Sequence, residues 1–259
     1  MDEFCIEHPS NEVNNRKARL VPLLSENPKY NEICELFNQG WKHPEKQLPR
    51  IRAIYKIIFP ESVVSPFLKY QSSLSSAPSF WSPFVQRTCT EALLFHGTNR
   101  ACLLGENTKN TMLCKLSGCS LCTIIRQSFD VSKCGNKHQF SRFGTGIYTS
   151  SCSSKADDYT RNLNGHAKLR VLLLNRVALG KTYKLRRNAT DLKQPPSGYN
   201  SVSGIPGLDL NYEESVVYNN DAIRPGYLLV YGDADIKEDH HKLVLKELVK
   251  KIFTTPLAA

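Results

Sequence analysis

The sequence predicts a single domain of the mixed α+β class, with mostly antiparallel sheets flanked by helices. Two patterns indicate this class: short apolar strands dominate the second half of the chain, and helical segments do not alternate regularly with them. With 259 residues, 41% of them hydrophobic and 22% charged, the chain can bury a substantial core. We find no internal repeat and no clean break, so we expect a loosely structured lead-in over 1–27 and one domain over 28–259.

The first half of the chain combines helical and strand patterns. In the run KYNEICELFNQGW, Tyr30, Ile33 and Phe37 fall on one helical face, and Gly40 follows as a stop. The run RIRAIYKII alternates as a strand does, and SPFLKYQSSL is compatible with a short helix. The Ser- and Pro-rich stretch 72–83 is typical of a loop.

Strand patterns are denser in the second half. The runs ALLFHGTNR, FGTGIYTS and RVLLLNRVAL each predict a strand, and SSKADDYTRN predicts the start of a helix. EESVVY and GYLLVY predict two short strands, whereas PPSGYNSVSGIPGLD is expected to form a long loop. The tail predicts a terminal helix over about 238–253, because its apolar residues share one helical face.

Charge and cysteine content narrow the class of protein. The formal net charge of +10 suits an anionic partner such as a nucleotide, a nucleic acid or an acidic protein, although the basic residues are scattered. No apolar stretch is long enough to cross a bilayer, and the start MDEFCIEHPS lacks a secretion signal pattern, so we expect no membrane partner. Nine cysteines favour a reducing compartment, nuclear or cytoplasmic, with free or metal-bound thiols.

One hydroxyl-rich stretch, GIYTSSCSSKADDY at 146–159, has a tyrosine before it and another at its end. Serine and threonine favour turns and helix caps, because their oxygens bond nearby backbone groups. One interpretation is that Tyr148 and Tyr159 form the two faces of a slot for a flat ligand. The alternative is that both rings are half-buried core residues, as tyrosines often are.

Three segments in order carry a resemblance to a known family: FHGT at 95–98, FGTGIYTS with SSKADDY at 143–159, and YEESVVY at 212–218. Together they resemble the catalytic domain of the poly(ADP-ribose) polymerase family of ADP-ribosyltransferases, and weaker likenesses extend over about 28–232. The resemblance implies the ADP-ribosyltransferase fold, here with a cysteine-bearing insertion, and the use of NAD as a substrate.

The resemblance also assigns the residues that hold NAD. Tyr148 and Tyr159 would sandwich the nicotinamide ring, which suits rigid aromatic side chains. The backbone of Gly97 would pair with the carboxamide, because a residue without a side chain allows a close approach. His96 would hold a hydroxyl of the adenosine ribose, and Thr98 would bond to the ligand's ribose or to the loop around it.

Cleavage of NAD breaks a glycosidic bond to a cationic leaving group and builds positive charge on the ribose. An enzyme accelerates this step by fixing the ring and the ribose and by placing negative charge beside the cation. The Glu-x-x-Val-Tyr register selects Glu214 for this role, and the adjacent Glu213, on the opposite face of a strand, is expected to be solvated. The catalytic set that the resemblance implies is Glu214, His96 and Tyr148.

One position departs from the family pattern. A serine that follows the lysine of the Ser-Lys motif bonds the nicotinamide carboxamide in the family, and here that position is Ala156. Ser154 or Ser153 would compensate if the turn shifted, and we expect Ser154 to contact NAD.

The run CTIIRQSFDVSK resembles the helix that follows the His-Gly-Thr turn in the family, so the insertion lies at about 99–121. It carries a group of thiols. The spacing of Cys119 and Cys122 lets two thiolates bind one tetrahedral ion, and Cys114 is a fair third ligand. The candidates for the fourth ligand are Cys102, Cys134 and His138, of which we select Cys102. A structural zinc would stiffen a loop with little core of its own. The alternative is a set of ordinary reduced cysteines.

The leading hypothesis is an NAD-dependent ADP-ribosyltransferase that acts as a monomer. As an acceptor loop the segment near 195–208 is short, and no DNA-binding module is visible, so we favour a single transfer to a protein or nucleic-acid acceptor. A second hypothesis, supported by Ala156, is an inactive module that binds NAD or ADP-ribose. A third is a zinc-dependent nucleic-acid-binding protein, supported by the cysteines and the positive charge.

Overall fold

The computed structural model describes residues 17–75, 91–107, 110–134 and 141–233, which form a mixed α+β fold around a five-stranded antiparallel sheet. The strand order in this central sheet is β1-β2-β11-β7-β3. Its strands are β1 (Arg19–Leu23), β2 (Ile51–Ile58), β3 (Glu91–His96), β7 (Arg170–Ala178) and β11 (Ile223–Tyr231). The predicted fold class is therefore confirmed.

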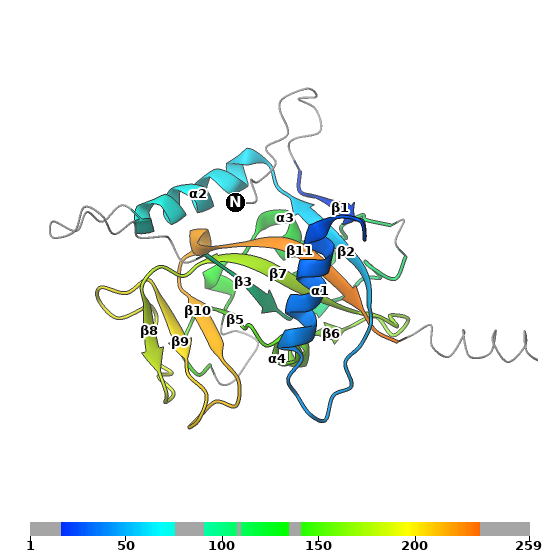
Figure 1. The fold of residues 1–259 in the computed structure, drawn as a ribbon. Coiled ribbons are helices and arrows are strands. Elements are labelled where there is room, and N and C mark those ends of the chain that lie inside the picture. Colours follow the sequence, from blue (N-terminus) through cyan, green and yellow to red (C-terminus); the bar gives the residue numbers. More distant parts are fainter. Residues whose placement is uncertain (1–16, 76–90, 108–109, 135–140, 234–259) are drawn as a thin grey trace, which may run out of the picture.

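Helices cover both faces of the central sheet. The helices are α1 (Pro28–Gly40), α2 (Glu61–Ser75), α3 (Ser120–Gln127) and α4 (Ser153–Asp158), with 3-10 turns at Val131–Lys133 and Asn220–Ala222. Figure 1 shows α1 crossing one face of the sheet and α3 behind the other. In the part of the chain that the structure describes, no helix has the length and apolar character needed to span a membrane.

The sequence of β7, RVLLLNRVA, is almost continuously apolar because the strand is buried on both faces of the sheet. Leu172 and Leu174 belong to the core cluster that includes α1, whereas Val171 and Leu173 belong to the cluster that includes α3. Successive side chains of a strand point to opposite faces, so a strand covered on both sides needs apolar residues at every position. All four side chains are at most 1% exposed.

Helix α1 has the bounds that the sequence predicts, Pro28–Gly40. The Asn27 side chain caps its first turn, and Pro28 occupies the first helical position, where no N–H is needed. Ile33 and Phe37 are fully buried, as expected from their spacing on one helical face.

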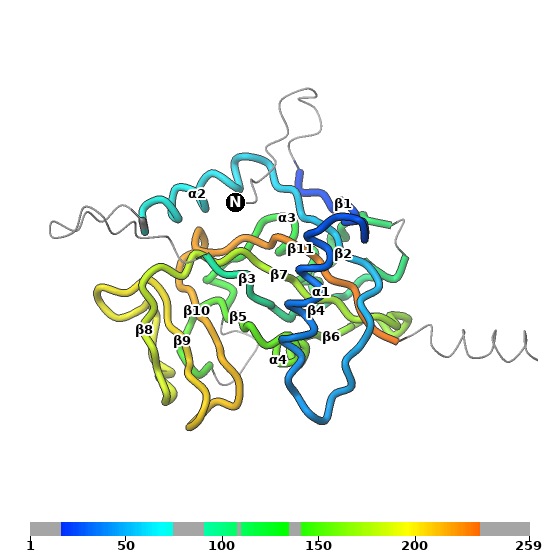
Figure 2. Tube along the Cα trace, viewed as in Figure 1, coloured from blue at the N-terminus to red at the C-terminus, as the bar shows by residue number. Residues whose placement is uncertain are grey.

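A second sheet of four strands lies at the β3 end of the central sheet (Figure 2). Its order is β5-β10-β9-β8, and only the pair β8 and β9 is parallel. Its strands are β5 (Ile147–Thr149), β8 (Thr182–Leu185), β9 (Ser201–Gly204) and β10 (Glu214–Val217). Phe95 and Ser150 exchange backbone hydrogen bonds of 2.8 and 3.0 Å, so the end of β3 is joined to the end of β5.

A buried arginine fastens the start of the cysteine-bearing insertion. This arginine, Arg100, belongs to the short strand β4 (Asn99–Arg100), which pairs in parallel with β6 (Arg161–Asn162). The Arg100 side chain is fully buried and donates hydrogen bonds of 2.6 Å to the carbonyl oxygens of Leu104 and Leu169. It also forms an ion pair of 2.7 Å with Glu106. A buried charge is tolerated only with such partners.

Four expectations about secondary structure were wrong. The lead-in predicted over 1–27 contains β1, which pairs along its full length with β2. The helix predicted from SPFLKYQSSL, at 65–74, is longer in the structure: α2 begins at Glu61, and its last residue, Ser75, falls in the predicted loop at 72–83. The predicted long loop before YEESVVY contains β9. The helix predicted from CTIIRQSFDVSK ends at Gln127, because Ser128 has a positive φ of 66°.

Some expectations fall on residues outside the described part of the chain. They are the terminal helix at 238–253, the first part of the lead-in at 1–16, and most of the loop at 72–83.

Candidate active site

The pairing of β10 with β5 places the acid and one tyrosine of the predicted site on the same face of the smaller sheet. Val216 pairs directly with Tyr148 across the two strands, so both side chains point to the same face. Glu214 lies two residues before Val216 and therefore shares that face. Its diagonal position puts it within reach of a long or aromatic neighbour.

The Glu214 carboxylate is buried, with 5% of the residue exposed, and its two oxygens differ in their partners. Oε1 lies 3.0 Å from the Lys155 ammonium on α4. Oε2 is also buried, but it has no hydrogen-bond partner among the described residues. Such an oxygen is costly to bury, because the water that it loses is not replaced. A ligand hydroxyl at this point would restore the missing hydrogen bond.

Two hydrogen bonds of its hydroxyl group hold the Tyr148 side chain in place. That oxygen accepts a 2.9 Å hydrogen bond from the backbone N–H of Phe143 and donates one of 2.8 Å to the Gly144 carbonyl oxygen. Burial raises the pKa of Tyr148 to about 12, and the Glu214 charge adds to the shift. The ring is therefore neutral and fixed in orientation, as a stacking surface requires.

Tyr159 ends α4 and is 43% exposed. Partial burial and then the Glu214 charge raise the pKa of Tyr159. The same carboxylate thus acts on both tyrosines, which come from β5 and from the end of α4. Tyr148 is the more deeply buried of the two rings.

His96, the last residue of β3, is fixed by two contacts. Its Nδ1 lies 2.8 Å from the Tyr148 carbonyl oxygen. Since a carbonyl oxygen only accepts, Nδ1 carries the proton. On another side, the Phe129 ring meets the imidazole edge to face, with centroids 5.0 Å apart and an angle of 89°. The histidine and the first tyrosine are therefore joined directly.

Gly97 is required by the closeness of α4. A Cβ atom at this position would lie 1.9 Å from the Ala156 carbonyl oxygen and 3.0 Å from the Thr160 hydroxyl. The next residue, Thr98, is partly buried, and its carbonyl oxygen accepts a long 3.4 Å hydrogen bond from the Arg161 N–H. The His-Gly-Thr turn and the helix that ends in Tyr159 thus pack backbone to backbone.

The serines expected to replace the missing hydroxyl have other partners. The Ser154 hydroxyl accepts hydrogen bonds from the backbone N–H groups of Lys42, at 2.9 Å, and His43, at 3.2 Å. The Ser153 hydroxyl donates to the Phe37 carbonyl oxygen at 2.6 Å. Both serines are fully buried. Both hydroxyl groups are thus already bonded within the protein, and the contact of Ser154 with NAD stays a prediction.

The sequence did not single out Lys155, whose ammonium forms the ion pair with Glu214. Its ammonium also donates to the Tyr212 carbonyl oxygen at 2.7 Å. Burial lowers the pKa of Lys155, although the Glu214 charge opposes that shift. The available signal was its place directly before Ala156 in the motif SSKADDY. Glu213, which was expected to be solvated, is partly buried, and Ser151 donates to its carboxylate at 3.0 Å.

The family whose model matches this chain is described as "Poly(ADP-ribose) polymerase catalytic domain", and the match covers residues 69–207. This is more than half of the 259 residues. The chain belongs to the poly(ADP-ribose) polymerase catalytic domain family. The family match includes the histidine and tyrosine motifs and ends before Glu214.

Curated relatives match between 25% and 61% of the chain. "Protein mono-ADP-ribosyltransferase PARP3" is 40% identical over 65 residues in Gallus gallus and over 67 in Mus musculus, each covering 25% of this chain. "Protein mono-ADP-ribosyltransferase PARP4" of Mus musculus is 28% identical over 165 residues, or 61% of this chain. These matches span only 12%, 12% and 8% of the relatives' own lengths.

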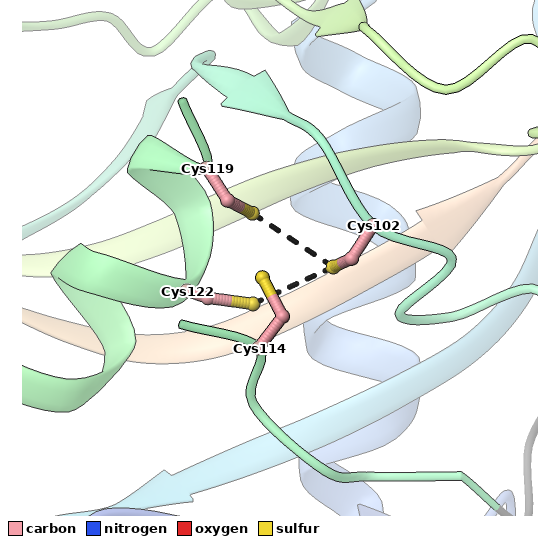
Figure 3. Close-up of side chains that lie close together, drawn as sticks. All are labelled: Cys102, Cys114, Cys119 and Cys122. Carbon is pink, nitrogen blue, oxygen red and sulfur yellow. Dashed lines mark hydrogen bonds between the residues drawn. The ribbon is translucent and has the colours of Figure 1, made fainter. Parts of the chain in front are cut away.

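This poly(ADP-ribose) polymerase family member also carries a cysteine cluster, formed by Cys102, Cys114, Cys119 and Cys122. The four sulfur atoms all lie within 4.8 Å of one another, and they point toward a common centre in Figure 3. The cluster could therefore hold a metal ion. Of the other ligands considered, Cys134 contacts the Asp130 carbonyl oxygen at 3.8 Å, and His138 lies outside the described residues.

Proposed function

We propose that this chain cleaves NAD, releases nicotinamide and transfers ADP-ribose to a macromolecular acceptor. The observation that carries the proposal is the buried Oε2 of Glu214, which lacks a partner among the described residues and belongs to a carboxylate whose charge acts on Tyr148 and Tyr159. The 2′-hydroxyl of the nicotinamide ribose would donate to this oxygen once the nicotinamide ring lies between the tyrosines.

In the proposed reaction, the bond between C1′ of the ribose and the ring nitrogen breaks, and its electron pair neutralises the departing nicotinamide. The acceptor's nucleophile then forms a bond to C1′ and loses its proton to solvent. Glu214 stabilises the cationic ribose, while Lys155 fixes the other carboxylate oxygen and favours its ionised form. His96, aligned by its contact with the Tyr148 carbonyl, would bind the adenosine ribose.

We favour a single transfer over the building of chains. Two observations support this choice: the matched relatives are named mono-ADP-ribosyltransferases, and the segment at 195–208 is short for an acceptor loop. We further propose that the chain acts as a monomer in the nucleus or cytoplasm. Protein and nucleic acid both remain candidate acceptors, because the net charge of +10 suits anionic partners of either kind.

The direct test of the proposal measures nicotinamide release and NAD binding by the wild-type protein and by Tyr159→Ala. Loss of the exposed ring should weaken NAD binding roughly 10- to 100-fold, because stacking on an aromatic side chain contributes about 1–3 kcal/mol. The control is Tyr159→Phe, which keeps the ring and should bind NAD nearly as the wild type does. If the wild type binds NAD but releases no nicotinamide, the chain is an inactive module that binds NAD or ADP-ribose. If it binds nucleic acid but not NAD, the hypothesis of a zinc-dependent nucleic-acid-binding protein is favoured.

The pH dependence of NAD cleavage tests the ion pair between Lys155 and the Glu214 carboxylate. Because burial lowers the pKa of Lys155, this lysine should lose its charge below the ordinary value of 10.5 as the pH rises. The rate of NAD cleavage should then fall on the alkaline side, since the Glu214 carboxylate loses its cationic partner. Lys155→Arg should move that fall to higher pH, because arginine stays protonated. Identical alkaline limbs in the two proteins would exclude this role for Lys155.

A further inference from the structure

We propose that the cysteine cluster binds one Zn²⁺ ion through four thiolates, and that this structural ion holds α3 in the position from which Phe129 supports His96. The sulfur distances fit such a site. A Zn–S bond of about 2.3 Å in a regular tetrahedron places neighbouring sulfurs about 3.8 Å apart. The Cys102 sulfur lies 3.8 Å from that of Cys119 and 3.6 Å from that of Cys122. Disulfide sulfurs would lie about 2.05 Å apart.

The ligands come from three separate places in the chain. Cys102 follows β4, Cys114 belongs to the irregular segment before α3, and the other two cysteines begin α3 (Figure 3). Each sulfur turns inward, although these segments are up to 20 residues apart in sequence. Reduced cysteines that only fill space have no reason to converge in this way, whereas a tetrahedral ion requires it.

The surroundings suit thiolates and a closed site. Cys119 is the N-cap of α3 and Cys122 lies in its first turn, where the helix dipole favours negative charge. Both residues are fully buried, and Cys114 is held by a hydrogen bond from the Arg126 guanidinium to its carbonyl oxygen. Four protein ligands leave no open position for substrate or water, which is typical of structural rather than catalytic zinc.

A bound zinc ion would cross-link the insertion, which has little regular secondary structure. Between β4 and α3, the described residues form no helix or strand, and their only bridge joins Leu104 to Asn107. Arg100 fastens the beginning of this segment, and an ion bound by Cys102, Cys114 and α3 would fasten the rest. Coordination free energy would add to the apolar contacts that Leu104 and Leu113 make with the core.

Helix α3 links the cluster to the candidate active site. It ends at Gln127, and after one residue of positive φ the Phe129 ring meets His96 edge to face. The chain therefore enters the insertion just after the His-Gly-Thr turn and, beyond α3, contacts the same histidine again through Phe129. The metal site itself does not depend on the proposed function; only its effect on NAD binding does.

Metal analysis of the full chain, purified under reducing conditions, tests the site. We expect about one zinc per chain in the wild type and a clear loss in Cys114→Ser. The control is Cys34→Ser, which changes another partly buried cysteine outside the cluster and should keep its zinc. If Cys114→Ser does not fold, a thiol-blocking reagent added to the wild type should release zinc into a colorimetric indicator. A wild type without zinc, or with iron instead, would overturn the proposal.

The link to His96 is tested with Phe129→Leu and its aromatic counterpart Phe129→Tyr. Phe129→Leu should keep its zinc and bind NAD about 2- to 10-fold more weakly, the loss expected for one aromatic contact. Phe129→Tyr should retain the wild-type affinity. Unchanged affinity in Phe129→Leu would overturn the link, whereas a wild type that holds zinc but binds no NAD would refute the proposed function and leave the metal site standing.

Discussion

Replacing Glu214 by glutamine is expected to slow nicotinamide release by about 100- to 1,000-fold, the usual effect of losing one electrostatic contact to a transition state. Glutamine has nearly the same shape, and its amide oxygen can still accept from Lys155. The substitution therefore removes the negative charge beside the ribose while the surrounding packing is preserved. Steady-state measurement of nicotinamide release, together with calorimetric binding of NAD, would separate lost catalysis from lost affinity.

Glu213→Gln is the matched control, because it makes the same chemical change one residue away. The Glu213 side chain is bonded to Ser151, and along a strand its direction is opposite to that of Glu214. We expect Glu213→Gln to release nicotinamide at a rate within about twofold of that of the wild type. Equal losses in the two variants, or full activity in Glu214→Gln, would contradict the assignment of the acid.

Gly97→Ala is expected to disrupt the site by displacing a helix. The added methyl group would lie 1.9 Å from the Ala156 carbonyl oxygen, a separation that no relaxation of a side chain can relieve. Helix α4 would have to move away from β3 and carry Tyr159 and Lys155 with it. Overpacking of this kind costs about 1–3 kcal/mol or more. NAD affinity should fall by about 10-fold or more, with a lowered melting temperature.

Gly165→Ala serves as the control for this substitution. A Cβ atom there meets nothing within 4 Å, and the residue has no positive φ. Its melting temperature and NAD affinity should match those of the wild type. If Gly97→Ala also matched the wild type in both measurements, the close approach of α4 would play no part in forming the site.

Hydrophobic periodicity predicted the well-buried elements, because their side chains follow the geometry of the element. Helix α1 and strands β2 and β7 are examples. It failed for β1, whose sequence RLVPL contains a proline and buries only Leu20. An edge strand is defined by its partner, here β2, and such long-range pairing leaves little trace in a short sequence.

The sequence motifs indicate which residues form the candidate site, but not the hydrogen bonds that these residues make. Adjacent strands carry Tyr148 and Glu214, so the two motifs meet in the fold. The motifs did not indicate that the Ser154 hydroxyl bonds Lys42 and His43, more than 100 positions away. A short polar side chain can satisfy many partners, and only packing decides among them. The same limit left several candidates for the fourth metal ligand, until folding brought Cys102 to the cluster.

The order of strands in the central sheet determines where the protein can be shortened. Strands β2 and β11 are neighbours in the middle of that sheet, yet both lie outside residues 69–207, as does the edge strand β1. A fragment cut at those limits would keep only β7 and β3 of the five and would expose their apolar edges to aggregation. Trimmed versions for expression or crystallisation should therefore retain at least residues 19–231.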